Sequence, residues 1–278
     1  MLNTKQIVVV VVVVVLMGGL LALPIKGLVN QDKESKASAT AEASSAYTLQ
    51  VVSDAAKQSV NTSLANEISA LEEQVAKAEG EEKLSLLAQL AQKWDDLAKY
   101  APQGFIYEEM AKISPKFEYW LKSGDSFREA YTNLQDTAMA VALNKMAIQS
   151  YEKAVELDGN NLDAKTGLGA AMVTGTNDPM GGIAILREVV QKDPKNIHAN
   201  RTLGLFSLQS RQFDKAIERF KTVVELKPDA ESYFYLATGY ENLGLKNEAI
   251  AAFQKSRALA ADPTLSQFID RRVEELSK

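Results

Sequence analysis

The sequence predicts an all-α protein, an array of paired antiparallel helices that follows one N-terminal transmembrane helix. Its composition favours helix over sheet, because Ala, Leu, Glu, Lys and Gln are frequent while 278 residues include only 15 glycines and 7 prolines. A spacing of 34 residues recurs in the second half of the chain. An uncharged apolar run stands close to the N-terminus. Together these observations predict helical repeats tethered to a membrane.

The apolar run, Ile7–Ile25, contains eight consecutive valines and no charged side chain. As a helix it would span about 28 Å, close to the hydrocarbon thickness of a bilayer. Valine prefers strands in water, but a backbone in lipid must satisfy its own hydrogen bonds, so helix is favoured there. We therefore expect a single-pass anchor over residues 7–25, after a tail of residues 1–6. Its apolar residues include Ile7, Val8, Val15, Leu21 and Ile25.

A cleaved signal peptide is the alternative for this run. The apolar region of a signal peptide is normally about 7–15 residues long, which is shorter than the run observed. Small residues that match an A-x-A cleavage site, Ala37–Ala39, lie more than ten residues beyond it. The distance favours an uncleaved anchor.

The orientation of the anchor stays open on charge alone. Lys5 precedes the run, whereas Lys26, Lys33 and Lys36 follow it. Counting Lys and Arg slightly favours a cytoplasmic location for the C-terminal side. A very short tail with one lysine is instead typical of bacterial anchors that export the residues behind them.

Two segments connect the anchor to the repeats. Residues 26–47 are expected to be a flexible linker, because Ala, Ser, Thr and charged residues dominate from Asn30 onward. A lead helix is expected over residues 48–79, where Leu64, Ile68, Leu71, Val75 and Ala78 are spaced 4, 3, 4 and 3 apart. An amphipathic helix that packs on its own domain is the favoured interpretation. A short coiled coil that self-associates through residues 60–78 is the alternative.

The repeat is clearest from Ile197 onward. Gly204 and Ala216 are small where two helices would cross closely, while Leu203 and Phe220 would fill the space between those helices. Pro228, which lies 34 residues after Pro194, would stop the second helix. The next unit carries the same pattern, with Tyr233, Tyr240, Ala249 and Phe253.

These units resemble the tetratricopeptide repeat (TPR) family. The resemblance implies a superhelix of paired antiparallel helices over residues 80–262, and it covers units at about 84–117, 118–161, 162–195, 196–229 and 230–262. Within the third unit, Asp178 and Pro179 indicate an N-cap followed by a first-turn proline. Residues 263–278 are expected to form a capping helix, with Phe268, Ile269 and Val273 facing the array.

A narrower resemblance rests on the phrases "LDAKTGLGAAMV" and "DPMGGIAILREVV". They are similar to membrane-anchored bacterial TPR proteins of the Bacteroidetes type, and one N-terminal span followed by repeats is common in such proteins.

The resemblance also implies a concave groove that binds extended or helical segments of other proteins. In this family the second, fifth, ninth and twelfth positions of each unit face the groove. These positions hold Asp163, Thr166, Ala170, Val173, His198, Arg201, Leu205, Leu208, Glu231, Phe234, Thr238 and Glu241. Among them Arg201 is the cation that could serve a carboxylate, and Leu205, Leu208 and Phe234 would form an apolar stripe. Burial against neighbouring helices is the alternative for the leucines.

The sequence predicts no catalytic residue, no metal site and no cofactor. Cysteine is absent, and the single histidine, His198, leaves no His pair for a metal or a triad. Gly124-Asp125-Ser126 resembles an esterase nucleophile motif, but Gly124 falls at a close-packing position of a repeat helix. A net charge of −5 with interspersed signs gives no basic face, so nucleic acid is not expected as a partner.

The sequence therefore predicts a membrane-tethered scaffold or adaptor that binds other proteins through its groove. The alternative is a periplasmic, chaperone-like assembly subunit of an envelope complex for secretion or cytochrome maturation. The expected location is the inner (cytoplasmic) membrane of a bacterium, with the array on the periplasmic side. The charge count does not decide the orientation, and the resemblance to exported, anchored repeat proteins favours the periplasm. Self-association, through residues 60–78 or through the anchor, is a further expectation.

Overall fold

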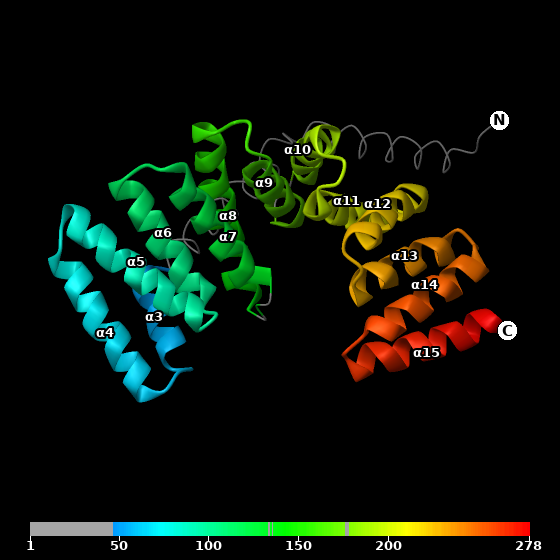
Figure 1. The fold of residues 1–278 in the computed structure, drawn as a ribbon, viewed down its shortest axis with the longest axis horizontal. Helices are drawn as coiled ribbons and strands as arrows, with labels where there is room; N and C mark the ends of the chain where they lie inside the picture. Colours follow the sequence, from blue (N-terminus) through cyan, green and yellow to red (C-terminus); the bar gives the residue numbers. More distant parts are fainter. Residues whose placement is uncertain (1–46, 133, 135, 176–177) are drawn as a thin grey trace, which may run out of the picture. The chain divides into compact units, whose positions relative to one another are not determined.

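The computed structural model describes residues 47–132, 134, 136–175 and 178–278, and all regular structure in this part of the chain is α-helical (Figure 1). Thirteen helices follow one another from α3 to α15 in these ranges. The expected anchor at residues 7–25 lies outside them, as does the expected linker up to residue 46. Among the helices described, we find none that combines the length and the apolar character needed to cross a bilayer.

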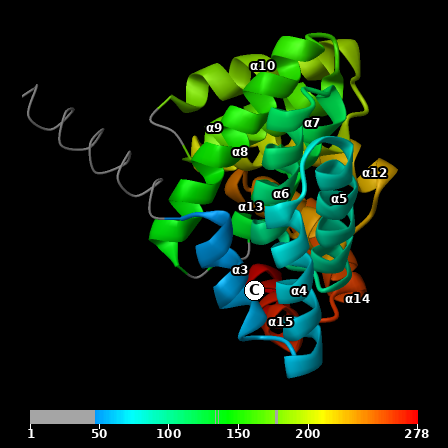
Figure 2. The same ribbon diagram turned by 90° about the vertical axis from the view of Figure 1, so that its left-hand side faces the viewer.

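The lead region contains two helices, α3 (Leu49–Lys57) and α4 (Thr62–Lys77), so the expectation of one helix over residues 48–79 was wrong. The chain breaks because Asn61 caps α4, where its Oδ1 accepts a hydrogen bond from the Leu64 amide at 2.9 Å. Ile68, Leu71 and Val75 are buried in one cluster with residues of α5 (Gly80–Asp96) and α6 (Tyr100–Ile113). Figure 2 shows α4, α5 and α6 side by side. The apolar seam of α4 thus packs within its own chain.

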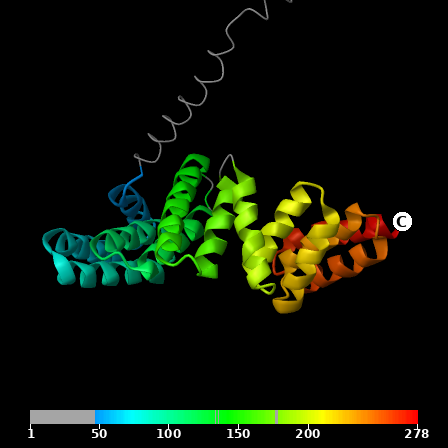
Figure 3. The ribbon, with the colours of Figure 1, turned by 90° about the horizontal axis from the view of Figure 1, so that it is seen from above.

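The remaining helices form antiparallel pairs, because three or four residues join the members of each pair. The first pair is α5 with α6, and Figure 3 allows the later ones to be followed along the chain. They are α7 (Phe117–Thr132) with α8 (Thr137–Leu157), α9 (Leu162–Gly175) with α10 (Pro179–Lys192), α11 (Ile197–Gln209) with α12 (Phe213–Leu226), and α13 (Ala230–Asn242) with α14 (Lys246–Leu259).

The second of these pairs is longer than the ones that follow it. Helices α7 and α8 have 16 and 21 residues, whereas each helix from α9 to α14 has 13 or 14. A side chain caps the start of α10, α11 and α13, whereas α12 and α14 begin without such a cap. At the start of α10, the Asp178 carboxylate accepts a hydrogen bond from the Gly181 amide, and Pro179 occupies the first helical position. This confirms the predicted cap of α10.

The core runs along the array as four successive apolar clusters. One joins α4 to α6, the next α7 to α9, the third α10 to α11, and the last α12 to α15. Because each cluster is built mainly by neighbours in the chain, the fold is stabilised by contacts between adjacent repeats.

Helix α15 (Pro263–Ser277) packs against the last cluster. Ile269 is fully buried and Val273 partly buried there, as predicted for a helix that ends the array. Phe268, which was expected to face the array in the same way, remains 43 % exposed. Its ring meets that of Phe234 at the edge of the cluster, with centroids 5.8 Å apart.

Candidate binding groove

The first helices of three consecutive pairs, α7, α9 and α11, line a common hollow of about 290 Å³. Three of the predicted groove residues, Thr166, Ala170 and His198, lie in its wall, as does Asp163. The other lining residues are Leu121, Asp125, Arg128, Gly167, Asn196 and Thr202. We call this site the α7–α9–α11 hollow. The structure therefore brings together predicted groove residues from two successive units.

A buried tyrosine supports two of the side chains that line this hollow. Tyr151 of α8 has no exposed surface, and its ring is held between two glycines. A Cβ atom at Gly124 would lie 2.7 Å from ring carbons of Tyr151, and one at Gly167 would lie 2.4 Å away. Because neither position tolerates a side chain beside the ring, the tyrosine can extend between α7 and α9 as far as the hollow.

The hydroxyl group of Tyr151 connects two charged side chains there. It donates to Asp125 Oδ1 at 2.8 Å, and it accepts from Arg128 Nε at 3.2 Å. The Arg128 guanidinium also reaches Glu129, with Nη2 and Oε1 2.9 Å apart. The hydroxyl group of Tyr151 therefore holds the side chains of Asp125 and Arg128 in place in the wall of the hollow.

The walls of the hollow shift the protonation equilibria of the groups they enclose. Burial raises the pKa of Asp125, against the stabilising hydrogen bond from Tyr151. Burial also raises the pKa of the Tyr151 hydroxyl well above its usual range. The pKa of His198 is lowered, first by partial desolvation and then by the positive charge of Arg128, although the residue as a whole is exposed. The hollow therefore favours a neutral imidazole beside a fixed carboxylate–guanidinium pair.

Arg201 is paired within the chain. Its Nη2 lies 2.6 Å from Asp229 Oδ2, and its Nη1 lies 3.4 Å from Glu231 Oε2. A carboxylate of a bound peptide would have to compete with both acids. The expectation that Arg201 serves such a carboxylate is therefore weakened by its surroundings.

The predicted apolar stripe does not stay together as one exposed surface. Leu205 and Leu208 are partly buried against the cluster of α12 to α15, so that the alternative interpretation describes them better. Val173 packs partly against the cluster of α10 and α11. Phe234 and Thr238 instead line a separate hollow of about 550 Å³ with α14 and α15, where Glu241 pairs with Arg272.

The residues of the repeat signature are placed mostly in the core. Leu203, Ala216, Phe220, Ala249 and Phe253 are buried, and Tyr233 and Tyr240 are half-buried. A Cβ atom at Gly204 would lie 2.8 Å from the Phe220 ring. Pro228 lies between α12 and α13 and is exposed.

Sequence reasoning missed Asp125, Arg128 and Tyr151 as a functional group. Asp125 and Arg128 have the spacing of an ordinary solvated helix face, and Tyr151 lies on another helix. The signal that could have found them is a tyrosine at the position where the later unit has Phe220, since a buried hydroxyl needs a partner. Within the described ranges, no three His, Cys, Asp or Glu side chains are grouped so that they could hold a metal ion.

Comparisons with known proteins agree with this architecture. Residues 128–234 match the sequence family described as the cytochrome c-type biogenesis protein H TPR domain. The cytochrome c-type biogenesis protein CcmH of Escherichia coli strain K12 is 25 % identical over 123 residues, which is 44 % of this chain and 35 % of the relative. A CcmH of Shigella flexneri matches equally well. The match thus spans about a third of the length of these relatives.

Among solved structures, MamA from Desulfovibrio magneticus RS-1 (residues 41 to the end) superposes with a TM-score of 0.51. It is 21 % identical, and the alignment covers 66 % of this chain and 97 % of that one. A double mutant of MamA from RS-1 gives the same score and identity. These likenesses concern the fold. The narrower likeness to proteins of the Bacteroidetes type stays a prediction.

Proposed function

On the premise that the chain belongs to the tetratricopeptide repeat family, we propose that it is a non-enzymatic adaptor that recruits a segment of another protein into the α7–α9–α11 hollow. The observation that carries this proposal is the hollow itself, because the first helices of three successive units contribute to one concave site. Its wall combines the apolar Leu121 and Ala170 with the polar group of Asp125 and Arg128. Such a mixture suits a peptide that inserts a side chain and hydrogen-bonds beside it.

The charged pair in the hollow supports selectivity. Tyr151 holds Asp125 and Arg128 in place before any ligand arrives, so binding does not have to order them. His198 adds a neutral ring that can donate or accept a hydrogen bond. A partner segment with both donor and acceptor groups would match this arrangement, whereas a purely apolar segment would leave Asp125 unpaired by the ligand.

A filled hollow is the test of this function. Ala170 lies in its wall, and Ala170→Phe would occupy the space without adding charge. Ala184→Phe is the matched control, because Ala184 is exposed on α10 and does not line the hollow. Affinity purification of the full-length chain from its native cells should lose a partner with Ala170→Phe and keep it with Ala184→Phe, while circular dichroism shows equal helix content. Equal recovery of the partner with both variants would show that the partner does not bind in the hollow.

The match to a cytochrome c biogenesis domain favours a second, narrower candidate function. In it the array is an assembly subunit that works with other envelope proteins during maturation of c-type cytochromes. Deletion of the gene in the native organism should then abolish covalent haem attachment, seen as loss of haem staining of c-type cytochromes on denaturing gels. Normal haem staining would contradict this candidate and leave the adaptor function intact.

We further propose that residues 7–25 anchor the chain in the inner membrane and that the array faces the periplasm. The support is the charge-free apolar sequence together with the match to an envelope biogenesis protein. Alkaline phosphatase fused after Lys278 should be active, and a reporter that works only in the cytoplasm should be silent. The reverse pattern would place the array in the cytoplasm.

A further inference from the structure

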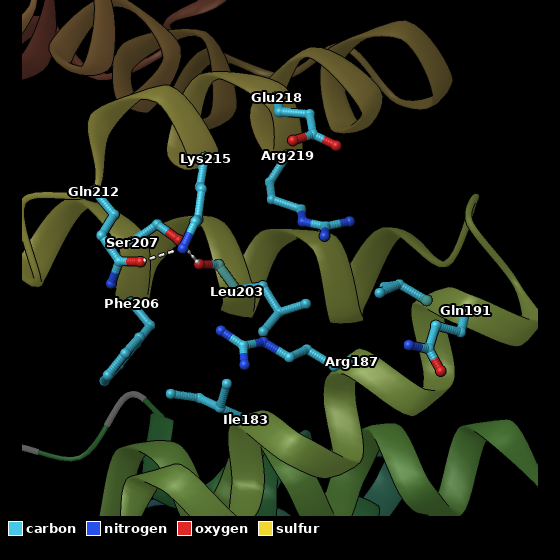
Figure 4. Close-up of a pocket in the computed structure, with 11 residues that line it drawn as sticks. Ile183, Arg187, Gln191, Leu203, Phe206, Ser207, Gln212, Lys215, Glu218 and Arg219 are labelled. Atoms are coloured by element: carbon cyan, nitrogen blue, oxygen red, sulfur yellow. Dashed lines mark hydrogen bonds between the residues drawn. The ribbon is translucent and has the colours of Figure 1, made fainter.

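A second hollow, of about 370 Å³, lies between α10, α11 and α12 (Figure 4). It shares no lining residue with the α7–α9–α11 hollow, and none of the groove positions expected from the repeat contributes to it. It is formed largely by two second helices, α10 and α12, of neighbouring pairs. We call it the α10–α11–α12 hollow. Nothing in the proposed function makes use of this surface.

The floor of this hollow is apolar. Ile183 and Leu203 are almost completely buried there, and Val190 and Phe206 lie beside them. An apolar side chain of a ligand could therefore be shielded from water on several sides. Covering about 50 Å² of such surface would contribute on the order of 1 kcal/mol.

The rim of the same hollow is cationic. Arg187, Lys215 and Arg219 all line it, and in Figure 4 their side chains reach from α10 and α12 into the hollow. Lys215 donates to the neutral Gln212 Oε1 at 2.6 Å, and Arg219 Nη1 donates to the neutral Asn200 Oδ1 at 3.1 Å. In the part of the chain that the structure describes, none of these three cations forms an ion pair with an acidic residue within 4.0 Å, although Glu218 also lines the hollow. Arg187 has no hydrogen-bond partner there either.

Three positive charges around one concavity are unfavourable for each other. They occur here in a chain whose net charge is −5, and half of whose other lysines and arginines in the described ranges have an acidic neighbour of the kind seen at Arg128, Arg201 and Arg272. At physiological ionic strength charges are screened beyond about 8 Å, so a ligand in the hollow would respond to these cations more than to the net charge. A ligand carboxylate would relieve their repulsion, and the planar guanidinium groups match it in shape.

We propose that the α10–α11–α12 hollow docks an acidic segment of a partner protein. A Glu or Asp side chain of that segment pairs with Arg187 and Arg219, with Lys215 in reach, and a neighbouring apolar side chain rests on Ile183, Leu203 and Phe206. The array then carries two independent docking surfaces, one on its first helices and one between its second helices. An adaptor with two such surfaces can hold two segments at once, and a single partner that supplies both gains avidity.

The test uses the full-length chain and a fluorescent synthetic peptide of alternating glutamate and leucine. Its counterpart with glutamine in place of glutamate keeps the size and the leucines. The glutamate peptide should bind at least about tenfold more tightly in fluorescence anisotropy, and its affinity should fall as salt rises. Arg187→Gln should weaken binding roughly fivefold to tenfold, which corresponds to one charge-assisted contact.

Two variants keep this experiment interpretable. Arg187→Gln removes no hydrogen bond within the described structure, so the fold should be retained, whereas Arg219→Gln would also withdraw a donor from the buried Asn200. Lys255→Gln is the charge-matched control, because Lys255 is exposed on α14, far along the chain from the hollow, and has no ion pair among the described residues. It should leave the affinity unchanged.

Several results would overturn the proposal. Equal affinity for the glutamate and glutamine peptides would do so, as would equal weakening by Arg187→Gln and Lys255→Gln. Loss of peptide binding with Ala170→Phe but not with Arg187→Gln would assign the peptide to the α7–α9–α11 hollow. Salt-sensitive dimerisation without peptide that Arg187→Gln removes would show that a second copy of the chain is the occupant. The comparison of the two peptides, and that of Arg187→Gln with Lys255→Gln, do not depend on whether the adaptor function through the first hollow is correct.

Discussion

In the pairs α7–α8 and α11–α12, an aromatic ring of the second helix packs against a glycine of the first helix, but the ring is different in each pair. In the later pair Phe220 of α12 lies against Gly204 of α11, and the contact is wholly apolar. In the earlier pair Tyr151 of α8 lies against Gly124 of α7, and also against Gly167 of α9. Both rings are fully buried. The two rings differ by one hydroxyl group, and the first helix of the next pair places Gly167 against Tyr151 but Tyr235 against Phe220.

The hydroxyl group of Tyr151 determines which side chains are held in place on the neighbouring surface. A buried phenol must find hydrogen-bond partners, and Tyr151 finds them in Asp125 and Arg128. The two charged side chains are thereby held in the α7–α9–α11 hollow instead of extending freely into water. Phe220 carries no hydroxyl group, and the neighbouring ring of Tyr235, with centroids 5.3 Å apart, is only half-buried and donates to the exposed Glu231. Lys215 and Arg219, on the same helix as Phe220, line the α10–α11–α12 hollow without an acidic partner among the described residues. The comparison teaches that one polar atom in the core can fix the charged side chains of the surface beside it.

The largest effect is expected where the backbone approaches Tyr151 most closely. A Cβ atom at Gly167 would lie 2.4 Å from the ring, and the buried ring has no room to move away. Gly167→Ala should therefore lower the free energy of unfolding by about 2–3 kcal/mol, despite the better helix propensity of alanine. Gly204→Ala, with a distance of 2.8 Å to Phe220, should cost less.

Urea denaturation followed by circular dichroism measures both values. Gly159→Ala is the control, because a Cβ atom there would lie no closer than 3.6 Å to its nearest neighbour, and it should change stability by less than about 0.5 kcal/mol. If Gly167→Ala were as stable as this control, the tight ring contact would be disproved.

An intermediate effect is expected for the hydroxyl group alone. Tyr151→Phe makes the earlier pair resemble the later one and leaves the half-buried Asp125 without the hydrogen bond that the tyrosine hydroxyl donates to it. The free energy of unfolding should fall by about 1–2 kcal/mol. Tyr233→Phe is the matched control, since the hydroxyl of Tyr233 makes no hydrogen bond within the described residues, and it should be close to neutral. Equal stability of the two variants would show that the hydroxyl group is not needed for the packing of the earlier pair.

The smallest effect concerns the single histidine. The folded-state pKa of His198 lies below its ordinary value of 6.5, so the folded protein binds this proton less readily than the unfolded chain does. Its contribution to stability is therefore complete above about pH 6.5 and is lost as the pH falls through the lower folded-state pKa. The urea midpoint of the parent should drop slightly more than that of His198→Gln between about pH 7.5 and about pH 5.5. Parallel pH profiles would contradict the lowered pKa.

The repeats could be predicted because their signature residues do the same job in each unit. Gly204, Ala216 and Phe220 have sizes set by the helix crossing, and such sizes can be read from spacing alone. The break between α3 and α4 was missed, although Asn61 followed by Thr62 and Ser63 is a capping signal. The prediction of one helix relied on the heptad-like spacing instead. That spacing begins only at Leu64, so it gave no evidence for a helix that continues from the residues before Asn61.

The sites were harder to predict for a physical reason. Thr166, Ala170 and His198 meet in one hollow because they occupy matched positions of adjacent first helices, which the repeat period reveals. Arg201 was expected to bind a ligand carboxylate because it occupies a groove-facing position of the repeat. It instead pairs with Asp229 and Glu231, which the repeat pattern of its own unit does not reveal. Tyr151, Asp125 and Arg128 come from two helices with unusual lengths, so the period gives no register for their contact.

The central claim is that the α7–α9–α11 hollow receives a segment of another protein. It is tested most directly by placing the photoreactive residue p-benzoylphenylalanine at position 198 of the full-length chain in its native cells, because His198 lines the hollow but is exposed, so that the probe need not fill the site. Position 184 is the control. After irradiation we expect a discrete crosslinked species from position 198 and none from position 184, and mass spectrometry of that species identifies the partner. The same crosslinked species from both positions, or none from position 198, would contradict the account.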